Sequence, residues 1–238
     1  HAADALCNLA IQRGSRDNVC ALVVNLQGYL TAPSPEASPT GAPRSPPLLD
    51  TRAPASAGEA MVVDAARHID IYTKIASERG WRITGVFDTH LQADHLSGGV
   101  ALASALGVDY WLHPYDSIHP DDLLPATFSF RYLKDEMTFT LGGVNIRALH
   151  LPGHTLGMTN PLVDDRYLLS SDTLFISAIG RPDLGGRAES WAPLLYHSLQ
   201  RVLALPDHTI ILPAHFSHMG EADEQGCYCA PLGTLHES

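Results

Sequence analysis

Six histidine and aspartate side chains follow segments whose residue pattern predicts β-strands. Neutral imidazole nitrogens and carboxylate oxygens are the ligands that Zn²⁺ and Fe²⁺ take in proteins. A single histidine is more often a hydrogen-bonded surface or core residue than a ligand. An ordered set at strand ends is different, because such ends converge on one edge of a sheet, and it predicts one metal site. The set consists of His90, Asp94, His95, His154, Asp172 and His215.

Four predicted strands position these side chains. Each strand is a short apolar segment, and the candidate ligand follows its C-terminal end within a few residues. The strands cover residues 83–87, 144–149, 167–169 and 209–212.

The remaining pattern predicts the layers around these strands. Helical spacing of apolar residues predicts helices over 69–79, 96–106 and 191–202. Strands interleaved with helices favour an α/β (α+β) fold in which two sheets are covered by helices. The other predicted strands cover residues 60–63, 110–112, 137–141 and 158–163.

Three zones of different composition predict the domain organisation. Residues 1–31 are expected to form a short helix followed by a strand over 19–26. Residues 32–57 are rich in proline, alanine and serine, which is typical of a linker or a long loop. The regular pattern of residues 58–238 predicts the catalytic domain.

Charge and composition exclude several classes of function. The net charge is -11, from 26 acidic and 15 basic residues, which disfavours binding to a nucleic-acid backbone. No apolar run has the length of a membrane span, and no secretion signal is visible, so we expect a cytoplasmic protein. The four cysteines predict neither a zinc ribbon nor a disulfide framework; they are Cys7, Cys20, Cys227 and Cys229.

Segment 89–95 resembles the His-x-His-x-Asp-His signature of the metallo-β-lactamase superfamily. His154, Asp172 and His215 match the remaining ligand positions of that superfamily in order. The resemblance covers roughly residues 58–233. It implies a four-layer αββα sandwich with the metal site at one edge of the two sheets.

Gln92 departs from this signature, because it replaces the second histidine. With that ligand altered, the resemblance leaves His90, His154 and Asp172 at the first site. Two histidines and one carboxylate are the ligand set of a mononuclear non-haem Fe(II) centre. Asp94, His95 and His215 would then form a second metal site or a hydrogen-bonded shell around the first. The list of candidate ligands is therefore compatible with Fe(II), or with one or two Zn²⁺.

Segment 179–186 is similar to the Gly-Arg-x-Asp segment of persulfide dioxygenases and their rhodanese-linked, glyoxalase II-like relatives. The similarity implies that Arg181, together with Asp183, binds the carboxylate of a small acidic thiol or acyl substrate. The alternative is a structural ion pair between Arg181 and Asp183 that closes a turn. Asp64, after the first strand of the domain, is expected to support the metal loop through hydrogen bonds.

The sequence is compatible with three functions. The first is oxidation of a thiol persulfide, such as glutathione persulfide, by O₂ at the iron site. The second is zinc-dependent hydrolysis of a thioester, lactone or β-lactam, with Asp94 orienting or deprotonating the attacking water. The third is a degraded, non-catalytic paralogue. A homodimer is also left open.

Residues 1–27 resemble the C-terminal end of metal-dependent phosphatases of the PP2C type. The resemblance rests on segment 10–19, and the metal partners that such a phosphatase needs are absent. No phosphatase activity is expected. The segment is either a remnant of a fusion, or its strand completes the first sheet, whose uncovered edge would otherwise favour aggregation.

Overall fold

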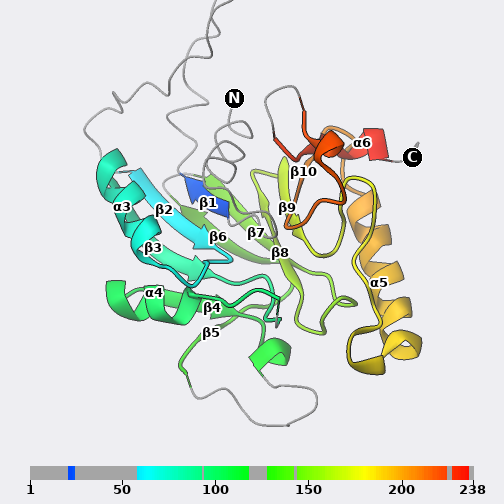
Figure 1. The fold of residues 1–238 in the computed structure, drawn as a ribbon, viewed down its shortest axis with the longest axis horizontal. Helices are drawn as coiled ribbons and strands as arrows, with labels where there is room; N and C mark the ends of the chain where they lie inside the picture. Colours follow the sequence, from blue (N-terminus) through cyan, green and yellow to red (C-terminus); the bar gives the residue numbers. More distant parts are fainter. Residues whose placement is uncertain are drawn as a thin grey trace, which may run out of the picture.

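The computed structural model describes residues 21–24, 58–92, 94–117, 128–141, 144–223 and 227–235. Two sheets face each other, and helices cover their outer faces (Figure 1). α3 (Asp70–Arg79) and α4 (Gly99–Leu106) lie against the first sheet, and α5 (Ala188–Leu203) lies against the second. The four-layer αββα architecture is therefore confirmed.

The first sheet has the strand order β1-β2-β3-β4-β5. Strands β2 to β5 run parallel to one another, whereas β1 pairs antiparallel with β2. Since parallel strands end at the same edge, the loops after β2, β3 and β4 meet there. The strands are β1 (Ala21–Val24), β2 (Gly58–Val63), β3 (Trp81–Phe87), β4 (Asp109–Leu112) and β5 (Arg131–Tyr132).

The second sheet has the strand order β11-β10-β9-β8-β7-β6. β9 and β10 are parallel, and the other pairs are antiparallel. The two shortest strands, β5 and β11, were not predicted, because two residues are too few to show a pattern. The strands are β6 (Met137–Leu141), β7 (Val144–His150), β8 (Thr159–Val163), β9 (Tyr167–Ser171), β10 (Ile210–Pro213) and β11 (Ala230–Pro231).

Helix α4 begins at Gly99, later than predicted. Gly98 N donates to Ala65 O at 2.6 Å, and this hydrogen bond ties the chain before the helix to the loop after β2.

Short helical segments lie between or after these elements. The short segments are η1 (Pro114–Ser117), η2 (Leu184–Gly186), η3 (Met219–Glu221) and α6 (Leu232–Leu235).

Three apolar layers hold the sandwich together. Phe87 and Ile146 belong to the layer between the two sheets. Leu102 belongs to the layer under α3 and α4, and Leu168 to the layer under α5 and α6. All four side chains are fully buried. This packing makes the sheets a rigid base for the loops at their edges.

The strand predicted over 19–26 is present as β1, which pairs with β2 from Ala21↔Val63 to Val24↔Ala60. The remaining residues of the PP2C-like segment and the predicted linker 32–57 lie outside the described residues. The division into three zones therefore stays a prediction. Among the helices that the structure describes, none has the length and apolar character of a membrane span.

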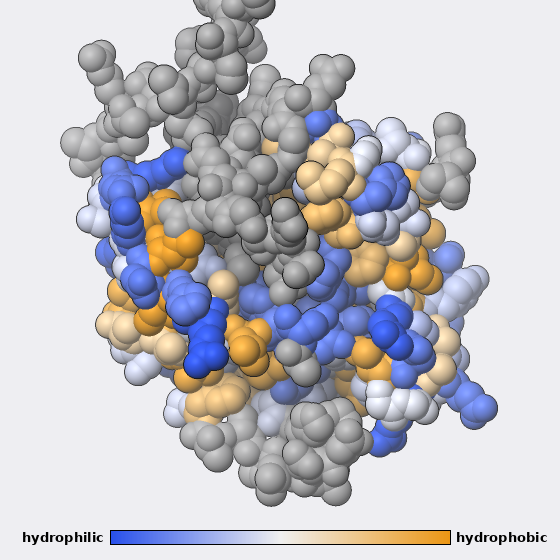
Figure 2. Space-filling view, in the orientation of Figure 1, coloured by the Kyte–Doolittle hydropathy of each residue, from blue (hydrophilic) through white to orange (hydrophobic). Residues whose placement is uncertain are grey.

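Among the residues that the structure describes, the exposed large apolar side chains come from separate elements. They are Leu96, Leu106, Tyr115, Tyr132, Ile179, Tyr196 and Met219. Figure 2 shows hydrophilic residues across the middle of one face, between apolar patches over the two halves of the sandwich. The visible part of this face therefore offers no single continuous apolar surface.

Candidate metal centre

His90, His154 and Asp172 meet where the two sheets end. His90 follows β3 in the first sheet, whereas His154 follows β7 and Asp172 follows β9 in the second. One ligand atom from each residue can be chosen so that all three atoms lie within 4.8 Å of one another. Asp172 Oδ2 lies 3.3 Å from His154 Nε2 and 3.8 Å from His90 Nε2. We call these three residues the first ligand group.

The first ligand group has the burial and unsatisfied atoms of a metal site. The exposed fractions are 7% for His90, 3% for His154 and 2% for Asp172. His90 Nε2 is buried without a hydrogen-bond partner among the described residues. A buried polar atom without a partner is costly, and a metal ion would satisfy it. The residues present therefore fit the metal that the ligand pattern implies.

Asp94, Asp172 and His215 form a second ligand group. His215 Nδ1 lies 2.8 Å from Asp172 Oδ1, and His215 Nε2 lies 4.0 Å from Asp94 Oδ2. Asp172 therefore belongs to both groups, with Oδ2 toward the first and Oδ1 toward the second. A carboxylate placed in this way can serve two ions.

Hydrogen bonds set the ring tautomers of the first group. His154 Nδ1 lies 3.1 Å from Arg181 O, and a carbonyl can only accept, so Nδ1 carries the proton. His90 Nδ1 lies 3.0 Å from Thr89 Oγ1. That hydroxyl lies 2.9 Å from Asp64 Oδ2 and donates to it, so His90 Nδ1 donates to the hydroxyl oxygen. In both rings the lone pair that a metal would bind is therefore on Nε2.

The charge states also suit metal ligation. Burial lowers the pKa of His90 to about 4, although the neighbouring Asp172 carboxylate opposes the shift. Burial likewise lowers the pKa of His154. For Asp172, burial raises the pKa, but the hydrogen bond from His215 and the nearby histidines outweigh it and bring the pKa below its usual value. Near neutral pH the group is thus two neutral imidazoles and one carboxylate.

Gln92, which departs from the signature, lies inside this cluster. Its side-chain amide is 2.9 Å from His154 Nε2. Because His154 Nε2 is an acceptor, the amide NH₂ must face it, and in that orientation it also donates to Asp94 Oδ1 at 3.0 Å. Gln92 therefore occupies the lone pair of His154 that a metal would use.

Asp64 forms the hydrogen bonds predicted for it near the metal loop. Its Oδ1 accepts from Thr89 N at 2.7 Å, and both of its oxygens contact the Thr89 hydroxyl. Asp64 has a φ of 51°, in the left-handed region that non-glycine residues rarely adopt. This conformation aims the carboxylate at the residue before His90.

His95 belongs to neither ligand group. Its Nε2 atom is buried and has no hydrogen-bond partner among the described residues. It also lines a hollow of about 350 Å³ together with Arg67, Leu91 and Leu96. Its role as a ligand stays a prediction.

Arg181 and Asp183 form the ion pair that was the alternative to a substrate site. Arg181 Nε and Nη2 donate to the two Asp183 oxygens at 2.7 and 2.9 Å. The pair is exposed, and its contribution to substrate binding stays a prediction.

The backbone of this segment also supports the site, which the sequence did not predict. The carbonyl of Arg181 accepts a hydrogen bond from His154 Nδ1. Gly180 packs closely against the backbone of Asp172, because a Cβ at this position would lie 1.8 Å from Asp172 O.

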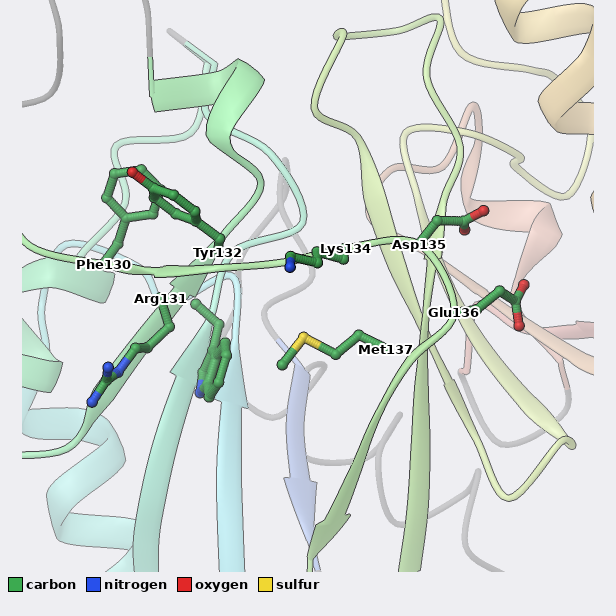
Figure 3. Close-up of a pocket in the computed structure, with 8 residues that line it drawn as sticks. Phe130, Arg131, Tyr132, Lys134, Asp135, Glu136 and Met137 are labelled. Atoms are coloured by element: carbon green, nitrogen blue, oxygen red, sulfur yellow. The ribbon is translucent and has the colours of Figure 1, made fainter.

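A larger hollow, of about 620 Å³, lies between β5 and β6. Figure 3 shows Phe130, Tyr132 and Lys134 around it, with the carboxylates of Asp135 and Glu136 pointing away. None of its lining residues is a candidate ligand. The volume of a hollow therefore does not identify the metal centre.

Asp88 is a fully buried carboxyl group beside the ligand loop. Its Oδ2 accepts from the Ser97 and Tyr110 hydroxyls, whereas Oδ1 has no partner among the described residues. Burial, with a smaller effect from Asp64, raises the pKa of Asp88 from 3.8 to about 7. Ionisation of this group therefore opposes folding.

We expect the free energy of unfolding of metal-free Asp88→Asn protein to fall less steeply with rising pH than that of the wild type. A carboxyl group whose pKa is raised on folding lowers the free energy of unfolding by about 1.4 kcal/mol for each pH unit between its unfolded and folded pKa values. For Asp88 that window runs from 3.8 to about 7. The check is the free energy of denaturant unfolding of chelator-treated protein across this range. Equal slopes for wild type and variant would contradict the expectation.

Comparison with known proteins places this geometry in a family. The family model described as "Metallo-beta-lactamase superfamily" matches residues 55–215, so the match does not include the PP2C-like segment. A hydroxyacylglutathione hydrolase of Rhizobium etli is 31% identical over 159 residues, which are 66% of this chain and 57% of that protein. The chain thus spans little more than half of that relative.

Two further proteins are similar to this chain. A probable zinc-dependent hydrolase of polyketide biosynthesis from Bacillus velezensis is 32% identical over 163 residues, which are 66% of this chain and 67% of that protein. The crystal structure of a metallo-β-lactamase from Staphylococcus aureus superposes with a TM-score of 0.65 at 28% identity. That match covers 75% of this chain and 54% of the other.

Proposed function

Because this chain belongs to the metallo-β-lactamase superfamily, a family of metal-dependent enzymes, we propose that it hydrolyses acyl thioesters of a small acidic thiol. The observation that carries this proposal is the position of Asp172, which presents one oxygen to each of two ligand groups. A site for two ions favours hydrolysis over chemistry at a single iron. The names of the Rhizobium and Bacillus relatives, both hydrolases, support the same reading.

Zn²⁺ held by these groups would polarise the substrate carbonyl and lower the pKa of a water molecule. Asp94 is half exposed, at 52%, and faces His215 across the second group. It would accept a proton from the attacking water as the new C–O bond forms. The C–S bond then breaks, and the proton passes to the departing thiolate. Acid and free thiol are the products.

The test of this proposal is hydrolysis of a panel of acyl thioesters by the zinc-loaded protein. We expect turnover in the wild type and a loss of at least about 100-fold in Asp94→Asn, the size expected for a general base. Asp109→Asn is the matched control, because Asp109 is an exposed partner of Arg131 on β4 and contacts no candidate ligand. A protein that binds stoichiometric zinc and cleaves no thioester would overturn the proposal.

Persulfide oxidation is the second candidate, and the Gln92 amide favours it. With no third imidazole, the first group offers two histidines and one carboxylate, the ligand set of Fe(II) oxygenases. The reaction would convert a persulfide, O₂ and water into sulfite and the free thiol. Persulfide-dependent oxygen uptake by iron-loaded protein, without thioester hydrolysis, would favour this candidate.

A further inference from the structure

We propose that Asp116, in η1, is a positioning residue that holds the His90 loop and the His154 loop at the separation that metal binding requires. The inference rests on the metal centre of the proposed function, but not on its substrate. Asp116 itself belongs to neither ligand group.

The Asp116 carboxylate bonds to the immediate neighbours of two ligands. Its Oδ2 accepts from Leu91 N at 3.3 Å, and Leu91 directly follows His90. The same oxygen accepts from Thr155 Oγ1 at 2.9 Å, and Thr155 directly follows His154. Oδ1 accepts from Gly157 N at 2.8 Å, further along the same loop. One side chain therefore ties together both histidine loops.

These hydrogen bonds connect two loops that belong to different sheets and that no strand pairing connects near the ligands. Leu91 follows β3 of the first sheet, whereas Thr155 and Gly157 lie between β7 and β8 of the second. The backbone bond from Thr159 N to Thr89 O, at 2.9 Å, also crosses between the sheets, but it lies at the base of the two loops. The hydrogen bonds of Asp116 connect the two loops at a second place, at the residues that directly follow His90 and His154.

Close packing shows that the carboxylate has a built position. A Cβ on Gly157 would lie 2.6 Å from the Asp116 carboxyl carbon, so a glycine is needed at this contact. The segment before η1 packs on the strand that leads into this loop, because the rings of His113 and of His150, the last residue of β7, stack with centroids 4.1 Å apart and planes 6° apart. The region of η1 thus contacts the chain around His154 at His150, Thr155 and Gly157.

The position of a ligand matters because metal affinity depends on groups that orient the ligands. Removal of such a group commonly costs about 10- to 100-fold in metal affinity. Loss of the Asp116 carboxylate frees Leu91 N, Thr155 Oγ1 and Gly157 N, and lets the His90 and His154 side chains move apart. We therefore expect weaker metal binding in a protein that still folds.

The experiment compares Asp116→Ala and Asp116→Asn with Asp164→Ala. Asp164 is the matched control, because its Oδ1 also accepts a backbone N–H, from Asn145 at 2.9 Å. It lies in the turn between β8 and β9, at the opposite end of those strands from the ligands. Zn²⁺ affinity is measured by competition with a chromophoric chelator, and the Tm of each metal-free protein is measured in parallel.

We expect Asp116→Ala to weaken Zn²⁺ binding by about 10- to 100-fold, Asp116→Asn to weaken it less, and Asp164→Ala to leave it unchanged. If Asp116→Ala does not fold, Thr155→Val removes one of the three donors and should weaken binding several-fold. Wild-type affinity in both Asp116→Asn and Thr155→Val, or equal losses in Asp164→Ala, would overturn the inference. Zinc binding without thioester hydrolysis would instead refute the proposed substrate and leave the positioning role intact.

Discussion

Asp172→Asn is expected to abolish metal binding at both ligand groups and to reduce hydrolysis by more than about 100-fold. The side chain presents Oδ2 to the first group and Oδ1 to the second, so the substitution turns one oxygen into an NH₂ group that cannot bind a metal and leaves the other a weaker, neutral ligand. Asparagine keeps the shape but loses the negative charge. Removal of a ligand should exceed the 10- to 100-fold effect of removing a group that only orients one. Elemental analysis of metal per chain is the measurement.

Two single variants show whether Asp172 is shared. His154→Ala removes a ligand of the first group alone, and His215→Ala removes a ligand of the second group alone. Each should lower the metal content by one ion if two ions bind. Asp172→Asn protein that retains the metal content of the wild type would contradict the sharing. About one iron per chain in the wild type, with no zinc, would instead favour the oxidative chemistry.

Gln92→His is expected to raise metal affinity at the first group by more than about tenfold. In the wild type the Gln92 NH₂ group donates to His154 Nε2 and to Asp94, and so competes with a metal for the His154 lone pair. An imidazole at this position removes that competition and adds a ligand, an effect at least as large as that of an orienting group. We also expect the variant to favour zinc-dependent hydrolysis over oxygen uptake. The measurement is chelator competition with Zn²⁺.

Gln92→Leu separates the two contributions. Leucine removes the competing donor without adding a ligand, so any gain in affinity should be smaller than that of Gln92→His. Equal affinity in wild type, Gln92→His and Gln92→Leu would show that residue 92 does not face the ligands.

The residue pattern predicted the types of the candidate ligands, their order along the chain and the architecture that brings them together. Three candidate ligands, His90, His154 and Asp172, follow strands whose apolar pattern is strong enough to predict. Since parallel strands of one sheet end at the same edge, the pattern predicts convergence within each sheet. The family resemblance predicts that the metal site lies at one edge of both sheets. The short strands β5 and β11, and the first turn of α4, depended on contacts with distant residues and were not predictable in this way.

The division of roles among the converged side chains follows from tertiary contacts and not from the residue pattern. The two faces of Asp172, the donor orientation of the Gln92 amide and the acceptor role of Arg181 O all depend on contacts between loops that are far apart in the sequence. Asp116 is separated from Leu91 by 25 residues and from Thr155 by 39. Local sequence pattern carries no information about such pairs, because the direction of a side chain is set by whatever packs against it.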